Sequence, residues 1–168
     1  MKNLILILLF FTSIHMFGQK SMDQLLDKYN KETVPYITVS ELQGNLSNYL
    51  ILDTRLKEEY DVSHIPGAIW VSEKMDDEIY AFAKAQKDQP IVVYCTVGVR
   101  SEDFGEDLQK RGFINVQNLH GSIFSWKDAD LPIENSQGEI TDRVHVYSKE
   151  WGQYLQNGVK VTKTEKRE

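Results

Sequence analysis

The chain has 168 residues, a length that fits one ordinary domain with short additions. Hydrophobic residues make up 41% and charged residues 26%, which excludes a disordered chain, a collagen-like chain and a polytopic membrane protein. The formal net charge of -6 gives no electrostatic reason to expect a nucleic-acid partner. The single cysteine, Cys95, excludes a disulfide within the chain and argues against a Cys-based structural zinc site.

The first nineteen residues have the order of charges and side chains that is typical of a secretory signal. A short positive start is followed by an unbroken apolar run over residues 4–11 and by the small residue Gly18. The apolar run is too short for a comfortable membrane span. We therefore predict a signal peptide over residues 1–19, an exported protein (periplasmic or secreted) and no stable membrane insertion after cleavage. An uncleaved N-terminal anchor and a buried helix are the alternatives.

The remaining chain alternates predicted helices and strands. Apolar spacing and turn residues predict, in order, a helix over 21–31, a strand over 36–39, a helical turn from an N-cap at Ser40 to residue 46, and a strand over 49–52. A polar loop over 54–67 leads to a strand over 68–71, a helix that begins at the acids 76–78, a strand over 91–94, a helix over 101–111, a strand over 114–119 and a short helix before Pro132.

This alternation predicts an α/β fold with a parallel sheet. In open parallel sheets, ligands bind outside the carboxyl ends of the strands. Residues 53–55, 95–100 and 119–121 follow three of the predicted strands. We therefore expect these segments to converge on one site, although they are far apart in the sequence.

The segment 95–101 carries the candidate chemistry. It lies between a buried strand and a helix N-terminus, and Gly98 allows a left-handed backbone at its centre. Such a loop can turn successive N–H groups inward, and these dipoles together with Arg100 favour the thiolate form of Cys95, which is the nucleophile. The alternative is that Cys95 is an ordinary buried side chain.

Three stretches of the sequence resemble the signatures of a single-domain rhodanese. They are Leu-Asp-Thr-Arg at 52–55 with Glu-Glu-Tyr at 58–60 and Ser-His-Ile-Pro-Gly-Ala at 63–68, the Cys-x-x-Gly-x-Arg-Ser pattern at 95–101, and Asn-Leu-His-Gly-Ser-Ile-Phe-Ser-Trp at 118–126. Ser63 and His120 stand where the family has glycine. The resemblance implies a rhodanese-like three-layer fold, with a mostly parallel central sheet flanked by helices. It places a helical lead-in at 20–35, the rhodanese-like domain at 36–133 and a C-terminal extension at 134–168.

The resemblance implies a sulfurtransferase. The Cys95 thiolate would attack a small anionic sulfur donor such as thiosulfate, and the resulting persulfide would pass its outer sulfur to cyanide or a small thiol. No cofactor is implied. The donor would be held by the remaining loop residues, which are Thr96, Val97, Gly98, Val99, Arg100 and Ser101, with Arg100 adding positive charge. Asp53 and Arg55 are candidates for supporting the loop; a buried ion pair, or a pair between Arg55 and Glu59, is the alternative.

Two other activities remain open. Phosphatases and arsenate reductases on a similar loop generally place five residues between cysteine and arginine, whereas four separate Cys95 from Arg100. A non-catalytic, rhodanese-like binding module is the other alternative, and the intact loop argues against it.

The histidines and tryptophans have simpler interpretations. We predict that His64 is structural, bonding across a turn, and leave open whether His120 faces the site. Trp70 and Trp126 are predicted to be core aromatics. A metal site built from Cys95, His64 and His120 is disfavoured, because no two of them have the spacing of a ligand pair.

The extension over 134–168 alternates apolar and polar residues around 143–147 and continues with Trp151, Tyr154 and Leu155. This pattern is compatible with a hairpin or helix that packs on the domain, or with an exposed partner surface. Neither interpretation alters the predicted chemistry. The charged end over 160–168 is predicted to be a solvent-exposed tail.

Overall fold

The computed structural model describes residues 21–86 and 89–162, so the predicted signal peptide lies outside the described residues. The helices are α1 (Met22–Tyr29), α2 (Val39–Gln43), α3 (Lys57–Val62), α4 (Asp77–Ala85), α5 (Val99–Lys110) and α6 (Ser122–Asp128), with 3₁₀ turns η1 (Leu46–Asn48) and η2 (Trp151–Tyr154). The strands are β1 (Tyr36–Ile37), β2 (Leu50–Asp53), β3 (Ile69–Trp70), β4 (Ile91–Tyr94), β5 (Val116–Leu119), β6 (Ile133–Glu134), β7 (Ile140–Thr141), β8 (Arg143–His145) and β9 (Val159–Val161).

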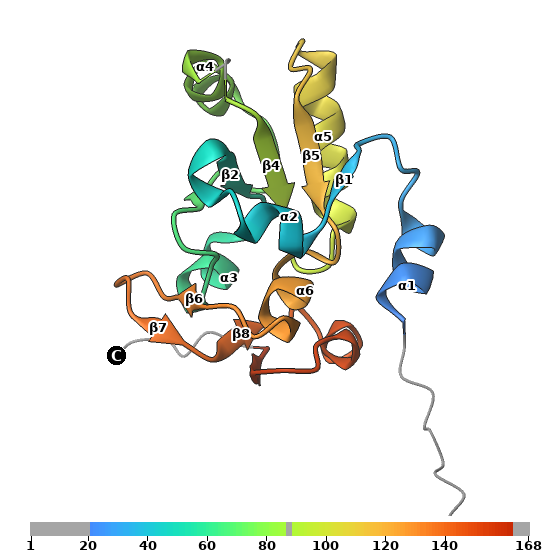
Figure 1. The fold of residues 1–168 in the computed structure, drawn as a ribbon, viewed down its shortest axis with the longest axis vertical. Coiled ribbons are helices and arrows are strands. Elements are labelled where there is room, and N and C mark those ends of the chain that lie inside the picture. Colours follow the sequence, from blue (N-terminus) through green and yellow to red (C-terminus); the bar gives the residue numbers. More distant parts are fainter. Residues whose placement is uncertain (1–20, 87–88, 163–168) are drawn as a thin grey trace, which may run out of the picture.

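The central sheet confirms the predicted α/β fold. Its five strands run in the order β1-β5-β4-β2-β3, and every neighbouring pair is parallel. Every residue of β2 and of β4 is buried, as expected for strands with helices on both faces. Figure 1 shows β4 and β5 pointing toward α6 and the C-terminal segments, so the carboxyl ends of the strands face the extension.

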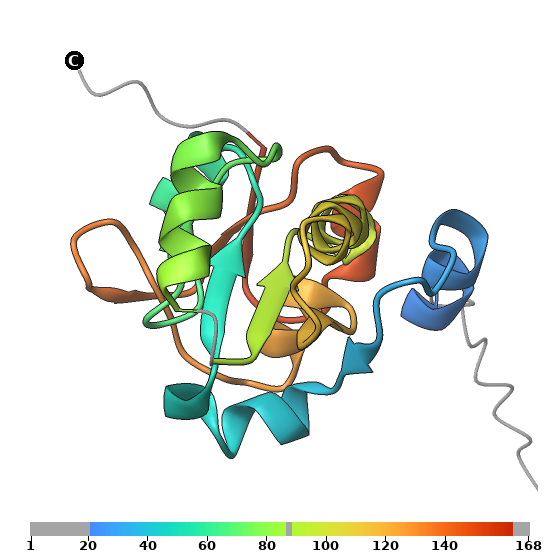
Figure 2. The same ribbon diagram turned by 90° about the horizontal axis from the view of Figure 1, so that it is seen from above.

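Alternate residues of the strands supply two cores, one on each face of the sheet. One core joins strand residues to α4 and α5, through Leu50, Leu52, Ile91, Val93, Ala83, Phe104 and Leu108. The other joins strand residues to α1, α2 and α6, through Ile51, Val92, Leu26, Leu42, Ile123 and Phe124. Figure 2 shows α4 and α5 on one side of the strands and α2 on the other. The fold is therefore three-layered.

Three local predictions are wrong. The predicted polar loop after β2 contains α3, a helix too short and too polar to show an apolar stripe, with Glu59 as its buried residue. The N-cap of α2 is Thr38 rather than Ser40, because Thr38 and Glu41 form a reciprocal capping box. Trp70 is not a core residue: it is 37% exposed, and its indole N–H donates to the Arg55 carbonyl at 2.8 Å.

The extension is part of the folded domain. β6 and β7 form an antiparallel hairpin, and β8 pairs with β9 in parallel. Val144, Val146 and Leu155 are buried in the same core as α6. This confirms packing on the domain, one of the two interpretations left open by the sequence. Within residues 21–86 and 89–162, no helix has the length and apolar character needed to cross a membrane.

If the extension stabilises the domain, Leu155→Ala should lower the free energy of unfolding by about 2–5 kcal/mol, because it removes a fully buried side chain and leaves a cavity. Val159→Ala is the matched control, since Val159 is 55% exposed, and it should change stability by no more than about 0.5 kcal/mol. Urea denaturation of both variants measures the difference. Equal stabilities would show that the extension is a passive attachment.

Candidate active site

Cys95 lies directly after β4, at the start of the loop that leads into α5. Its side chain is almost fully buried, and the Gly98 N–H donates to its Sγ at 3.2 Å. Gly98 is the N-cap of α5 with φ +115°, and a Cβ there would lie 3.2 Å from Cδ2 of Leu26. A side chain at this position is therefore disfavoured by the left-handed backbone, and it would also press against the end of the Leu26 side chain. The glycine closes the loop tightly around the sulfur.

Other elements hold the loop in this conformation. The Gly98 carbonyl accepts from Asn30 Nδ2 at 2.9 Å and from Asn118 Nδ2 at 2.8 Å. The Cys95 N–H donates to Ser122 Oγ at 3.0 Å. Asn118 lies in β5 and Ser122 begins α6, and both belong to the third sequence signature. That signature therefore acts as the support of the cysteine loop, a role that sequence reasoning did not assign to these side chains.

The surroundings of Cys95 favour its thiolate. Burial raises the pKa of the Cys95 thiol, but the positive charge of Arg100 and hydrogen bonds from Ser101 and Gly98 lower it by more, so the pKa lies below its ordinary value. The Ser101 hydroxyl donates its one proton to Asn118 Oδ1 at 2.8 Å, which leaves the Ser101 backbone N–H as the donor to the sulfur. The thiolate is the nucleophilic form of cysteine, so this confirms the electrostatic expectation from the sequence.

Arg100 is held by carboxylates. Its Nη1 contacts Glu59 Oε2 at 2.8 Å and Glu73 Oε1 at 2.6 Å, and its Nη2 contacts Glu59 Oε1 at 2.9 Å and Thr96 Oγ1 at 2.7 Å. Two carboxylates therefore oppose one guanidinium. Arg100 remains close enough to stabilise the Cys95 thiolate, but its charge is already matched by protein groups.

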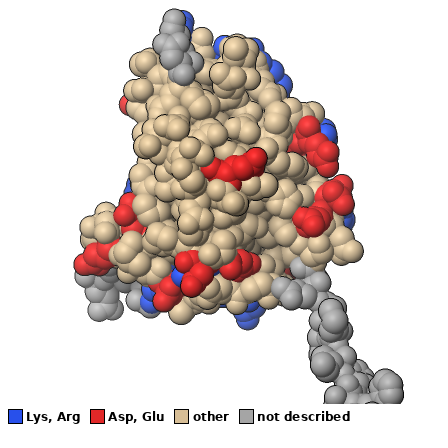
Figure 3. Space-filling model, viewed as in Figure 1, with Lys and Arg blue, Asp and Glu red and all other residues tan. Residues whose placement is uncertain are grey.

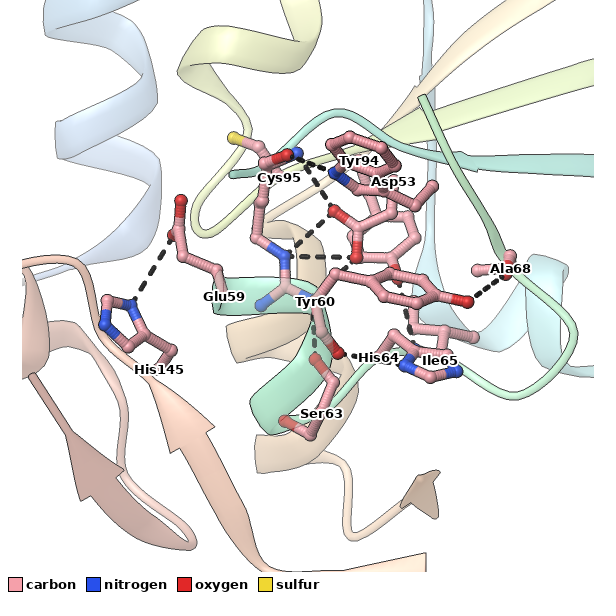
Figure 4. A network of polar contacts seen from close by, with 12 residues as sticks. Asp53, Glu59, Tyr60, Ser63, His64, Ile65, Ala68, Tyr94, Cys95 and His145 are labelled. Carbon is pink, nitrogen blue, oxygen red and sulfur yellow. Dashed lines mark hydrogen bonds and ion pairs between the residues drawn. The ribbon is translucent and has the colours of Figure 1, made fainter. Parts of the chain in front are cut away.

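Glu59 is the centre of this polar network. Its carboxylate is fully buried on α3, and its Oε2 accepts from the Leu56 N–H at 3.0 Å. His145 of β8 approaches it, with Nδ1 3.8 Å from Oε1 (Figure 4). Burial raises the pKa of Glu59, but the contacts with His145 and Arg100 lower it by more. The pKa therefore lies well below the usual range for glutamate, and the carboxylate is ionised. In the sequence, Glu59 belongs to the first signature and is an alternative partner of Arg55, but no contact with Arg100 is predicted for it.

Asp53 and Arg55 form a buried ion pair of their own. Arg55 Nη2 lies 2.6 Å from Asp53 Oδ2, and both side chains are inaccessible to solvent. The same Nη2 donates to the Ser63 carbonyl at 2.6 Å. This confirms the buried-pair interpretation and shows the pair tying the end of β2 to the end of α3.

The histidines do not assemble at the cysteine. His64 stacks on Tyr60, with ring centroids 3.8 Å apart, and its Nδ1 lies 3.0 Å from the Tyr60 carbonyl, which agrees with a structural role (Figure 4). His120 Nε2 lies 3.3 Å from Asp23, away from the cysteine pocket described below. Trp126 is a core residue, as predicted. In the described part of the chain, no group of three or more His, Cys, Asp or Glu side chains is placed to hold a metal ion.

A cavity of about 160 Å³ opens at the cysteine. From the predicted loop it is lined by Cys95, Thr96, Val97, Val99 and Arg100, and from the extension by Tyr147 and Trp151. Gly98 and Ser101 are not among its lining residues, although both form hydrogen bonds with the Cys95 sulfur. The extension therefore supplies part of the cavity wall, while the prediction that it does not alter the chemistry stays a prediction.

Comparison with known proteins places this loop in a family. The model of the rhodanese-like domain matches residues 38–129, more than half of the chain. Over 125 residues the chain is 34% identical to tRNA uridine(34) hydroxylase of Streptococcus thermophilus, and the match covers 70% of this chain but only 37% of that protein. The chain thus spans little more than a third of the length of this relative.

Solved structures agree with this assignment. A rhodanese-related protein from Thermoplasma volcanium has a TM-score of 0.51 and 27% identity, over 59% of this chain and 96% of that one. Thiosulfate sulfurtransferase from Pseudomonas aeruginosa has a TM-score of 0.58 over 80% of this chain and 25% of that one, and at 22% identity it shows a shared fold. The chain belongs to the rhodanese-like domain family.

The lowered pKa of Cys95 predicts that its alkylation rate, plotted against pH, has its inflection at a lower pH than for an ordinary cysteine. The rate of reaction with iodoacetamide should rise with pH and level off below the ordinary cysteine value of about 8.5, because the loop stabilises the thiolate. The same chain unfolded in urea is the matched control, since its single cysteine is then exposed to water. An inflection in the folded protein at or above that of the unfolded chain would contradict the prediction.

Proposed function

We propose that this protein is a sulfurtransferase that moves a sulfane sulfur from thiosulfate or a similar donor to a thiophilic acceptor through a Cys95 persulfide. The observation that carries the proposal is the position of the Cys95 sulfur. It lies at a small cavity, receives a hydrogen bond from the Gly98 amide, and has a lowered pKa. These are the requirements of a cysteine that must act as a nucleophile and then hold an anionic sulfur.

The reaction divides into two displacements without net oxidation. The Cys95 thiolate attacks the outer sulfur of thiosulfate, forming a new S–S bond, while the S–S bond of thiosulfate breaks and sulfite leaves with the electron pair. The acceptor then attacks the outer sulfur of the persulfide, and the Cys95 thiolate leaves. The same groups that stabilise the thiolate, Gly98, Ser101 and Arg100, favour both its attack and its departure.

Three observations support sulfur transfer over the alternatives. A phosphatase loop generally places five residues between its cysteine and its arginine, whereas four separate Cys95 from Arg100. A binding module has no need of a cysteine with a lowered pKa. A tRNA-modifying enzyme must attract a polyanion, whereas acidic side chains are spread across the face shown in Figure 3 and basic ones lie mostly toward its margin.

The intact mass of the protein tests the proposal directly. Incubation with thiosulfate, or with mercaptopyruvate as a second donor, should add the mass of one sulfur to the wild type. Cys95→Ser should gain none, because serine cannot form a persulfide, and its melting temperature should confirm that it remains folded. Thiosulfate:cyanide turnover should disappear in the same variant, and a phosphate ester should not be hydrolysed by the wild type. A wild type that gains no sulfur from either donor would leave the binding module as the better proposal.

We also propose that the protein is exported, on the charged, apolar and small-residue order of residues 1–19. Protein isolated from its native host should then begin near Gln19 or Lys20. N-terminal sequencing measures this, and retention of Met1 would contradict cleavage.

A further inference from the structure

The cysteine pocket has a wall that the family match does not include. Tyr147 and Trp151 line the pocket beside Cys95, yet both lie beyond residue 129, where the match ends. The Tyr147 ring lies against Arg100, whose Cζ is 5.0 Å from the centroid of the ring. Tyr147 has φ +60°, a left-handed conformation that is unfavourable for an aromatic residue. The surrounding structure must therefore hold the ring at this place.

The residues next to the wall are firmly anchored. Val146 is buried, and its N–H donates to the Val161 carbonyl at 2.8 Å. Gly152 packs so closely that a Cβ there would lie 3.2 Å from Cγ2 of Val146. The Trp151 ring packs against Tyr29 of α1, with the two ring centroids 5.8 Å apart. The two aromatic rings are thus presented from a fixed support rather than from a free tail.

The pocket is largely apolar, and the charge of its one lining cation is already matched by carboxylates. Arg100 is the cation among the lining residues, and Glu59 and Glu73 already oppose it. The Thr96 hydroxyl is engaged as well, since it donates to Glu59 Oε1 at 3.0 Å and accepts from Arg100. The remaining lining side chains are apolar or aromatic, namely Val97, Val99, Tyr147 and Trp151.

This chemistry discriminates between classes of sulfur acceptor. Arg100 and the hydrogen bonds from Gly98 and Ser101 favour negative charge at the sulfur itself, where thiosulfate reacts. A charged group on the body of an acceptor lies instead against the aromatic rings, where it loses water and gains no countercharge, which costs free energy. An uncharged apolar molecule instead buries its surface against the rings, and Tyr147, which is 51% exposed, has area left to cover. The cavity of about 160 Å³ is smaller than the roughly 300–1,000 Å³ of pockets for drug-sized ligands, so the molecule must be small.

We propose that Tyr147 and Trp151 form a specificity wall that makes a small uncharged organic thiol, with an aromatic or aliphatic body, the preferred sulfur acceptor over a small anionic thiol. The inference rests on the proposed sulfur transfer and concerns its second step. The acceptor thiolate attacks the outer sulfur of the Cys95 persulfide, the S–S bond to Cys95 breaks, and a new organic persulfide leaves with the outer sulfur. The body of the acceptor lies against the wall while its sulfur reacts.

The experiment separates loading from discharge. The protein is first loaded with sulfur by thiosulfate and the persulfide is quantified by intact mass. The loaded protein is then mixed with benzyl mercaptan or with 2-mercaptoethanesulfonate, and each discharge rate is divided by that of the same thiol with a low-molecular-weight persulfide. The wild type should favour benzyl mercaptan by about tenfold or more. Tyr147→Ala and Trp151→Ala should each reduce this preference by roughly two- to tenfold, as expected for loss of one aromatic contact.

Matched variants show whether the effect belongs to the wall. Tyr80→Ala removes a tyrosine that also packs against an arginine, Arg111, at 5.1 Å, but on α4 and outside the pocket, and it should retain the preference. Tyr147→Phe keeps the ring and should retain it as well. Loaded protein that discharges to both thiols equally, or wall variants with unchanged preference, would overturn the inference alone. Failure to load any sulfur would overturn the proposed function and the inference together, at a separate step.

Discussion

The ion pair between Glu59 and Arg100 is the interaction on which the rest of the site depends. Burying a carboxylate costs free energy that only good pairing and hydrogen bonding offset, and Glu59 has both: two contacts to Arg100 and one each to Thr96 and the Leu56 N–H. His145 approaches the same carboxylate. One side chain thereby joins α3, the cysteine loop and the extension. Loss of it would leave Arg100 with Glu73 as its remaining carboxylate partner and remove the polar link among the three.

The reactivity of Cys95 follows from a balance of opposed effects. Burial alone would raise its pKa and leave an inert thiol, as in most buried cysteines. Arg100 and the hydrogen bonds from Gly98 and Ser101 outweigh burial, so that the net shift of the Cys95 pKa is downward. They can do so only because Asn118 and Ser122 hold the loop in place. The nucleophile is thus a property of the supported loop rather than of the cysteine itself.

The site divides between two parts of the chain. The part that matches the rhodanese-like domain supplies the nucleophile and the hydrogen bonds that activate it, within residues 38–129. The extension contributes Tyr147 and Trp151, which line the cavity beside the Cys95 sulfur. Under the proposal made above, activation of the cysteine and selection of the acceptor are physically separate, and the wall could differ between relatives without any change in the loop.

The sequence by itself determined the parallel α/β sheet, because β2 and β4 are continuous apolar runs, and it determined the cysteine loop, because its glycine and arginine are local to Cys95. Helix α3 escaped prediction because its buried residue is a carboxylate rather than an apolar side chain. Only the tertiary structure decided that Arg100 is matched by Glu59 and Glu73, and that Tyr147 lines the pocket. These contacts join residues more than twenty positions apart. No local periodicity encodes them, since they arise only when separate elements pack at one end of the sheet.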